Sequence, residues 1–256
     1  MCLIFFAIDQ HPEYRLIIAG NRDEFYNRKT APAEFWPDYP ELLGGRDLEA
    51  MGTWLGMTRS GRISMLTNYR DLAGLKNHAP SRGKLVSDYL IGNARPEDYL
   101  GGVAKKGQEF NGFNLLAGDV NSLWYYSNYG DGIRHLVKGT FGLSNHLLDT
   151  PWPKVKKGKL AFERILASKN KMTTEVLFEL LSDEEIAPDD ALPATGLSIE
   201  RERALSSMFI KSPDYGSRCS TVIMINRNND VIFSERVFDL QTFAYTTQTF
   251  EFSLEA

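Results

Sequence analysis

The sequence has only two cysteines among its 256 residues, Cys2 and Cys219, and they lie far apart. So few cysteines exclude a disulfide-rich secreted scaffold and suit a reducing compartment, although one disulfide is possible in an oxidising compartment. The four histidines lack the spacing of metal ligands, so we expect no metal site. No apolar run approaches the roughly 18 residues of a membrane span, so we expect no integral membrane segment.

Charge of neither sign dominates the chain. The formal net charge is -4, with 24% charged and 43% hydrophobic residues, an ordinary balance for a globular domain. It gives no reason to expect nucleic acid or an anionic membrane as a partner. The apolar start has no basic segment and is soon interrupted by Asp9 and Glu13, unlike a signal peptide. We therefore expect a cytoplasmic protein, and no pattern indicates a particular oligomeric state.

The first residues of the chain contain the strongest local pattern. Two apolar, strand-forming runs, 2–8 and 14–20, are joined by a short loop with a proline, which predicts a β-hairpin. If the turn centres on the middle of the loop, Cys2 faces Gly20. Alternation of side chains then puts Arg22 on the same face as Cys2.

Cys2 is a candidate nucleophile because of this position. Removal of Met1 would leave one residue with both a thiol and an α-amine, and an α-amine titrates at about pH 7.7–8.0, where it can act as a general base. Arg22 would favour the reactive thiolate, and Asp23 would orient the amine and Arg22. Because Arg22 and Asp23 are adjacent, they face opposite sides if the strand continues. The alternative is a small hydrophobic residue at the start of a strand.

The rest of the chain predicts strands, then helices, then strands. We expect an irregular segment over 26–42, hairpins over 53–67 and 113–127, helices over 85–91, from 96, over 152–168 and over 174–181, an acidic surface excursion over 182–202, and strands over 221–226, 231–238 and 246–253. In helix 152–168 the lysines should be exposed. This order predicts an α+β fold in which the first strands, apolar on both faces, are covered on both sides.

Seven short blocks follow one another along nearly the whole chain: Met1–Ile4, Asn21–Phe25, Leu43–Asp47, Gly52–Gly56, Leu66–Arg70, Gly142–Asn145 and Tyr215–Thr221. In this order they resemble the NRDE-motif family, also called the transport and Golgi organisation family. That family in turn resembles the N-terminal-nucleophile (Ntn) hydrolases of the choloylglycine and penicillin V acylase type. The resemblance implies a four-layer αββα sandwich, and we expect residues 1–256 to form this single domain.

The resemblance also implies site residues. Asparagine after a strand is ordinarily a turn residue, but in acylase-type relatives asparagines at similar positions help to stabilise an oxyanion. A lone arginine is ordinarily a solvated charge, whereas here the resemblance implies one close to the nucleophile. We expect Cys219 to be a buried strand residue. The predicted catalytic residues are Cys2, Arg22, Asp23, Asn145 and Arg218, and the predicted substrate-binding residues are Asn21, Asn68 and Trp54.

Two functions follow from this resemblance. The first is hydrolysis of a linear, non-peptide C–N amide bond in a small molecule without a cofactor, with Cys2 attacking the carbonyl carbon. The second is a non-catalytic carrier or chaperone on the same scaffold, because eukaryotic members resembling this chain are associated with haem handling and lipid homeostasis. Haem would then be a possible ligand, although neither cysteine precedes a proline, as short haem-responsive motifs usually require.

Overall fold

The computed structural model describes residues 2–255. The strands are β1 (Cys2–Ile8), β2 (Tyr14–Phe25), β3 (Thr30–Trp36), β4 (Tyr39–Asp47), β5 (Leu55–Thr58), β6 (Ile63–Asn68), β7 (Phe113–Gly118), β8 (Leu123–Ser127), β9 (Arg134–Leu136), β10 (Gly139–Leu143), β11 (Tyr215–Asn226), β12 (Asp230–Phe238) and β13 (Tyr245–Ser253). The α-helices are α1 (Gly83–Ile91), α2 (Pro96–Lys106), α3 (Pro153–Leu166), α4 (Thr174–Leu181) and α5 (Ile199–Ala204).

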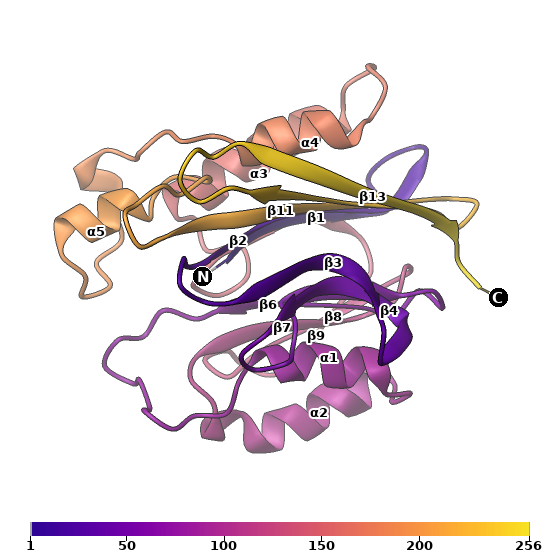
Figure 1. The fold of residues 1–256 in the computed structure, drawn as a ribbon, viewed down its shortest axis with the longest axis horizontal. Coiled ribbons are helices and arrows are strands. Elements are labelled where there is room, and N and C mark those ends of the chain that lie inside the picture. The colour runs from indigo at the N-terminus through magenta and orange to yellow at the C-terminus, as the bar shows by residue number, and fades with distance from the viewer. Residues whose placement is uncertain (1, 256) are drawn as a thin grey trace.

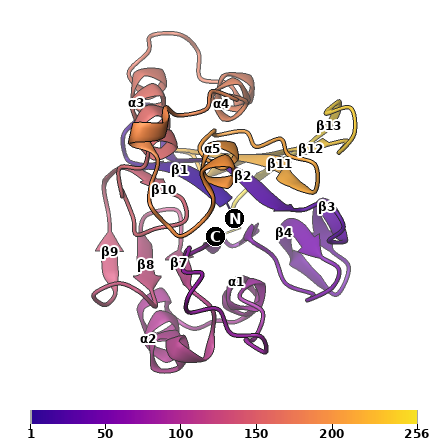
Figure 2. The ribbon, with the colours of Figure 1, turned by 90° about the vertical axis from the view of Figure 1, so that its left-hand side faces the viewer.

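These elements form two stacked antiparallel sheets with helices on their outer faces (Figure 1). One sheet has six strands in the order β10-β1-β2-β11-β12-β13, and the other has seven strands, from β3 to β9 in sequence order. Helices α3 and α4 cover the first sheet and α1 and α2 the second, while α5 lies at the end that faces the viewer in Figure 2. The predicted α+β class and αββα layering are confirmed. Within residues 2–255, no helix is long and apolar enough to cross a membrane.

The β1–β2 hairpin sets the register of the first sheet. Cys2 pairs with Arg22, so the predicted pairing of Cys2 with Gly20 is wrong by two residues. The reason lies in the loop, where Asp9 adopts a positive φ of 51° and donates its backbone N–H to Arg15 O at 2.8 Å. A shift of two residues preserves the faces, so Cys2 and Arg22 share a face as predicted.

Strand β1 is buried on both faces, as its apolar sequence predicts. Its even-numbered residues, from Cys2 to Ile8, pack in the core between the two sheets. Its odd-numbered residues, Leu3, Phe5 and Ala7, pack in a second core beneath the helices. The nucleophile candidate therefore begins a strand that is fixed from both sides.

The segment 26–42, predicted to be irregular, forms β3 and the start of β4. The prediction was wrong because the segment contains prolines, and proline ordinarily argues against a strand since it cannot donate a hydrogen bond within a sheet. Strand β3 is an edge strand, and Pro32 lies at a shift of register between Ala31 and Glu34, where a missing N–H is tolerated. The other strand and helix predictions differ from the structure mainly at their ends.

Helix α3 lies unusually close to β1. A Cβ atom on Gly158 of α3 would overlap the Phe5 ring and lie 2.7 Å from Met208 Sδ. Glycine at this position therefore reflects close packing of the helix on the sheet. Another residue of α3, Lys154, is buried, which contradicts the prediction that the lysines of this helix are exposed.

We expect Gly158→Ala to lower the free energy of unfolding by about 1–3 kcal/mol, because the added methyl group overpacks the core beneath α3. The matched control is Gly102→Ala in α2, where a Cβ meets nothing within 4 Å. That change should raise the free energy of unfolding by about 0.5–1 kcal/mol, because alanine gives the unfolded chain less conformational entropy than glycine does. Urea unfolding of both variants checks the prediction, and equal effects would contradict the close packing.

Candidate active site

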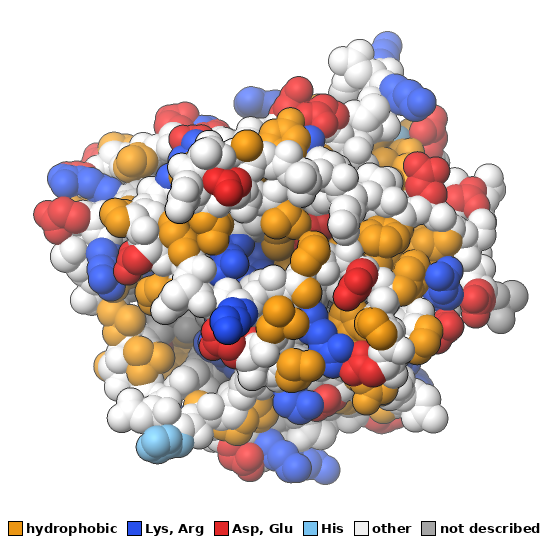
Figure 3. All heavy atoms as spheres, in the orientation of Figure 1, with side chains coloured by type: hydrophobic (Ala, Val, Ile, Leu, Met, Phe, Trp, Pro, Cys, Tyr) orange, Lys and Arg blue, Asp and Glu red, His pale blue; other side chains and the backbone are white. Residues whose placement is uncertain are grey.

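A cavity of about 910 Å³ opens at the end of the two sheets where Cys2 lies. This volume is in the range of small-molecule sites, roughly 300–1,000 Å³. Its wall combines ionisable side chains with apolar ones, and on the face in Figure 3 hydrophobic and basic side chains alternate across the middle of the molecule. Among the predicted site residues, those that line the cavity are Cys2, Arg22, Asp23, Trp54, Asn68 and Arg218.

The two cysteines lie on either side of Arg22. Cys2 pairs with Arg22 across β1 and β2, and Cys219 pairs with the same arginine across β2 and β11. Both thiols are free and buried, and Cys219 is a strand residue as predicted. Neighbouring strands lie about 4.8 Å apart, and the cysteines are two strand spacings apart with β2 between them, so their Cα atoms are about 10 Å apart, too far for a disulfide.

The Cys2 thiol is protonated at neutral pH. Burial raises its pKa to about 11, and the Asp23 charge adds to this effect. Arg22 and a hydrogen bond from the Asp23 backbone oppose the increase but do not overcome it. Arg22 favours the thiolate, as expected, but burial outweighs this one nearby cation. A nucleophilic role for Cys2 would therefore require a base to take the thiol proton.

Arg22 and Asp23 point to opposite faces, because β2 continues to Phe25. Arg22 shares the inner face with Cys2, donates from Nη1 to Thr30 Oγ1 at 3.3 Å and lies 4.0 Å from Glu24. Asp23 is buried on the other side, where its Oδ1 accepts a hydrogen bond from Ser217 Oγ at 2.7 Å. Burial raises the pKa of Asp23, and the charge of Lys154 opposes that increase.

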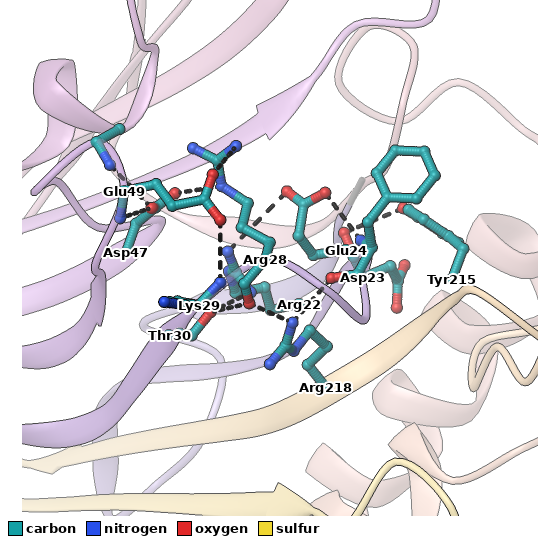
Figure 4. Close-up of polar contacts among 12 residues, drawn as sticks. Arg22, Asp23, Glu24, Arg28, Lys29, Thr30, Asp47, Glu49, Tyr215 and Arg218 are labelled. Atoms are coloured by element: carbon teal, nitrogen blue, oxygen red, sulfur yellow. Dashed lines mark hydrogen bonds and ion pairs between the residues drawn. The ribbon is translucent and has the colours of Figure 1, made fainter.

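Arg218 owes its position to a β-bulge. Ser217 pairs with Asp23 and Cys219 pairs with Arg22, so Arg218 is the extra residue between them. A bulge redirects a side chain out of the regular alternation. The Arg218 guanidinium donates from Nη1 to the backbone oxygens of Phe25, Tyr26 and Arg28, at 2.8, 3.1 and 2.5 Å (Figure 4). It thereby fixes the loop after β2 at the rim of the cavity.

The three predicted asparagines have different positions. Asn21 was predicted to bind substrate, but it does not line the cavity. Its Nδ2 points beneath the helices, where it donates to Leu181 O and Met208 O at 2.8 Å. Asn68 does line the cavity. Asn145 is buried behind it, with Nδ2 donating to Asn68 O at 3.0 Å and Oδ1 accepting from Ser144 Oγ. An oxyanion role for Asn145 stays a prediction.

Sequence reasoning missed several ionisable residues of the cavity, among them Glu235 and Arg82. Glu235 accepts a hydrogen bond from Ala33 N at 2.6 Å and one from Thr221 Oγ1 at 3.2 Å, and burial raises its pKa. Arg82 donates from Nη1 to Gly112 O at 2.8 Å, and burial lowers its pKa. One signal was available for Glu235, since it lies on the face of β12 that is otherwise apolar. Among residues 2–255, no group of three or more His, Cys, Asp or Glu could hold a metal ion.

A family model described as Transport and Golgi organisation 2 matches residues 1–240. The chain is 37% identical to a Transport and Golgi organization 2 homolog of Mus musculus, over all of both chains. It is 29% identical to Transport and Golgi organization protein 2 of Drosophila melanogaster, over 92% of this chain and 91% of that protein.

Among solved structures, the C2A mutant of conjugated bile acid hydrolase from Clostridium perfringens is similar in fold. The TM-score is 0.50 at 8% sequence identity, and the match covers 99% of this chain and 92% of that chain. At this identity the likeness concerns the fold, which is of the Ntn-hydrolase type.

Proposed function

The chain belongs to the Transport and Golgi organisation 2 family, and on that basis we propose that it hydrolyses a linear C–N amide with Cys2 as nucleophile. The observation that carries the proposal is the pairing of Cys2 with Arg22 at the wall of a cavity large enough for a small molecule. The Ntn-hydrolase-type fold supports it. We further propose a cytoplasmic location, which suits the two free thiols.

The proposed reaction has two steps. Cys2 Sγ forms a bond to the amide carbonyl carbon while its proton passes to a base, and the C–N bond breaks as the base returns that proton to the leaving amine. Water then attacks the thioester, releasing a carboxylic acid and restoring the thiol. We propose the α-amine of Cys2 as the base, which requires removal of Met1, a residue outside the described part of the chain.

The remaining residues have supporting roles in this proposal. Arg22 lies beside Cys2 and would stabilise negative charge on the sulfur. The amide group of Asn145 would stabilise the oxyanion, and Trp54 and Asn68, which line the cavity, would contact substrate. Arg218 would preserve the shape of the rim through its three backbone carbonyls.

The second candidate is a carrier of haem or a lipid, favoured by one observation: burial keeps the Cys2 thiol protonated, as in an inert buried cysteine. Of the described residues that line the cavity, none is a histidine. Haem held there would therefore use another axial ligand, such as the sulfur of Cys2 or Cys219. In a carrier, loss of the Cys2 thiol would leave lipid binding unchanged.

A panel of small acyl amides, assayed for release of primary amine, tests the first candidate. We expect Cys2→Ala to lose at least about a thousand-fold in rate, since the attacking atom is gone. Cys219→Ala, which removes the other thiol of the cavity, should lose far less. Absence of Cys2-dependent release, together with tight ligand binding by Cys2→Ala in calorimetry, would contradict hydrolysis and favour the carrier.

A further inference from the structure

Lys154 is a buried charge that the proposed mechanism does not use. It is the second residue of α3, and only 3% of its surface is exposed. Its Nζ has no hydrogen-bond partner among the described residues. The ammonium also lies in the first turn of a helix, where the helix dipole disfavours a positive charge.

Packing alone does not explain this lysine. Methionine has a similar length and would fill the same space without burying a charge. A buried cation without hydrogen bonds lowers stability unless nearby anions compensate it. Lys154 therefore belongs to the class of buried ionisable residues that mark functional sites.

The charged and titratable groups around Lys154 come from three elements and from the segment after β6. Asp23 of β2 and Glu202 of α5 favour its ammonium form, as does Cys2 of β1 when it is a thiolate, whereas Arg70, which follows β6, disfavours it. Burial is the largest influence and lowers the pKa of Lys154 to about 8. Arg70 and Glu202 pair with each other at 2.8 Å, so their charges largely cancel. Asp23 is then the main anion that faces Lys154.

We infer that Lys154 is a positioning residue of the Cys2 site: its buried ammonium is one of the groups that favour the ionised form of the Asp23 carboxylate, together with the hydrogen bond from Ser217. Its importance for catalysis rests on the proposed hydrolase function. The electrostatic coupling between Lys154 and Asp23 is independent of that function, because it acts on Asp23 whether or not the protein turns over a substrate. Without the ammonium, Asp23 would stay protonated to higher pH and would orient the neighbouring amine less well.

The first experiment measures the carboxyl carbon of Asp23 by NMR as pH is changed, with Asp23→Asn used to assign the signal. In Lys154→Met we expect the titration midpoint of Asp23 to rise by about one pH unit or more. The control is Lys156→Met, which removes an exposed lysine of the same helix and should leave the midpoint unchanged. A pH profile of activity would not suffice, since the α-amine also titrates at about pH 7.7–8.0.

The second readout is stability. A lysine whose folded pKa is lowered costs stability below that pKa, and the cost disappears as pH rises toward the unfolded value of about 10.4. Lys154→Met should therefore melt at a higher temperature than the wild type at pH 7, with a smaller difference at pH 9.5. A purely structural lysine would give the opposite sign at pH 7.

If Lys154→Met does not fold, the coupling is measured in the other direction. In the wild type the Cε carbon of Lys154 should titrate near pH 8, and in Asp23→Asn its midpoint should fall, because coupling between two sites is reciprocal. The inference is overturned if the Lys154 midpoint is the same in Asp23→Asn as in the wild type, or if the Asp23 midpoint is the same in Lys154→Met as in the wild type. Loss of amide hydrolysis alone would count only against the proposed function.

Discussion

Glu202→Leu should lower the free energy of unfolding by about 3–5 kcal/mol, because it leaves the buried Arg70 guanidinium without its carboxylate. Arg70 Nη1 lies 2.8 Å from Glu202 Oε2, and each side chain is only 4% exposed. Burial already lowers the pKa of Arg70 despite this pair. Arg70 also stacks over the Trp152 ring at 4.8 Å, so the uncompensated charge cannot easily move into water.

Urea unfolding measured by circular dichroism checks this value. Glu200→Leu is the control on the same helix, and because Glu200 is exposed its effect should stay within about 0.5 kcal/mol. The double variant Arg70→Met with Glu202→Leu should recover most of the loss, since no buried charge is left alone. A cost below about 1 kcal/mol for Glu202→Leu would mean that the pair is solvated.

The pair also matters for the cavity. Glu202 belongs to α5, whose residues Glu200, Arg201 and Ala204 line the cavity wall, and Arg70 lines the same cavity. The backbone N–H of Arg70 donates to Asn145 O at 2.8 Å. Loss of the pair should therefore weaken ligand binding as well as stability.

The sequence predicted the parts of this protein that depend on local periodicity. The two apolar runs of the first hairpin, and the alternation that places Cys2 and Arg22 on one face, follow from residues close together in the chain. The motif blocks then implied the αββα layering, which the structure confirms. Strand β3 was missed because proline is ordinarily a sign against a strand, and only its edge position permits it.

The parts that the sequence did not predict depend on contacts between distant segments. Asn21 belongs to the block 21–25, and its polar side chain was predicted to contact substrate. In the structure it donates instead to backbone carbonyl groups more than 150 residues away in sequence. Lys154 lies among exposed lysines, and only the sheet beneath α3 makes it buried. The raised pKa of Cys2 likewise comes from burial by both sheets, whereas the sequence showed only the neighbouring Arg22.

A covalent acyl group on Cys2 is the other large change that we expect. An attacking thiol must pass through a thioester, and an acyl-enzyme accumulates whenever its hydrolysis is slower than its formation. A slowly hydrolysed acyl amide, quenched in acid within seconds of mixing, should then give up to one acyl group per chain. Cys2→Ala should give none, while its fold and ligand binding remain.

Intact mass spectrometry of that quenched mixture, followed by peptide mapping, is the decisive measurement. It also shows whether Met1 is removed and the α-amine of Cys2 is free to act as the base. We predict a chain that lacks Met1 and has gained the mass of the acyl group on the peptide containing Cys2. Amine release without an acyl group on Cys2, or an acyl group on Cys219 instead, would contradict the assignment of Cys2 as the nucleophile.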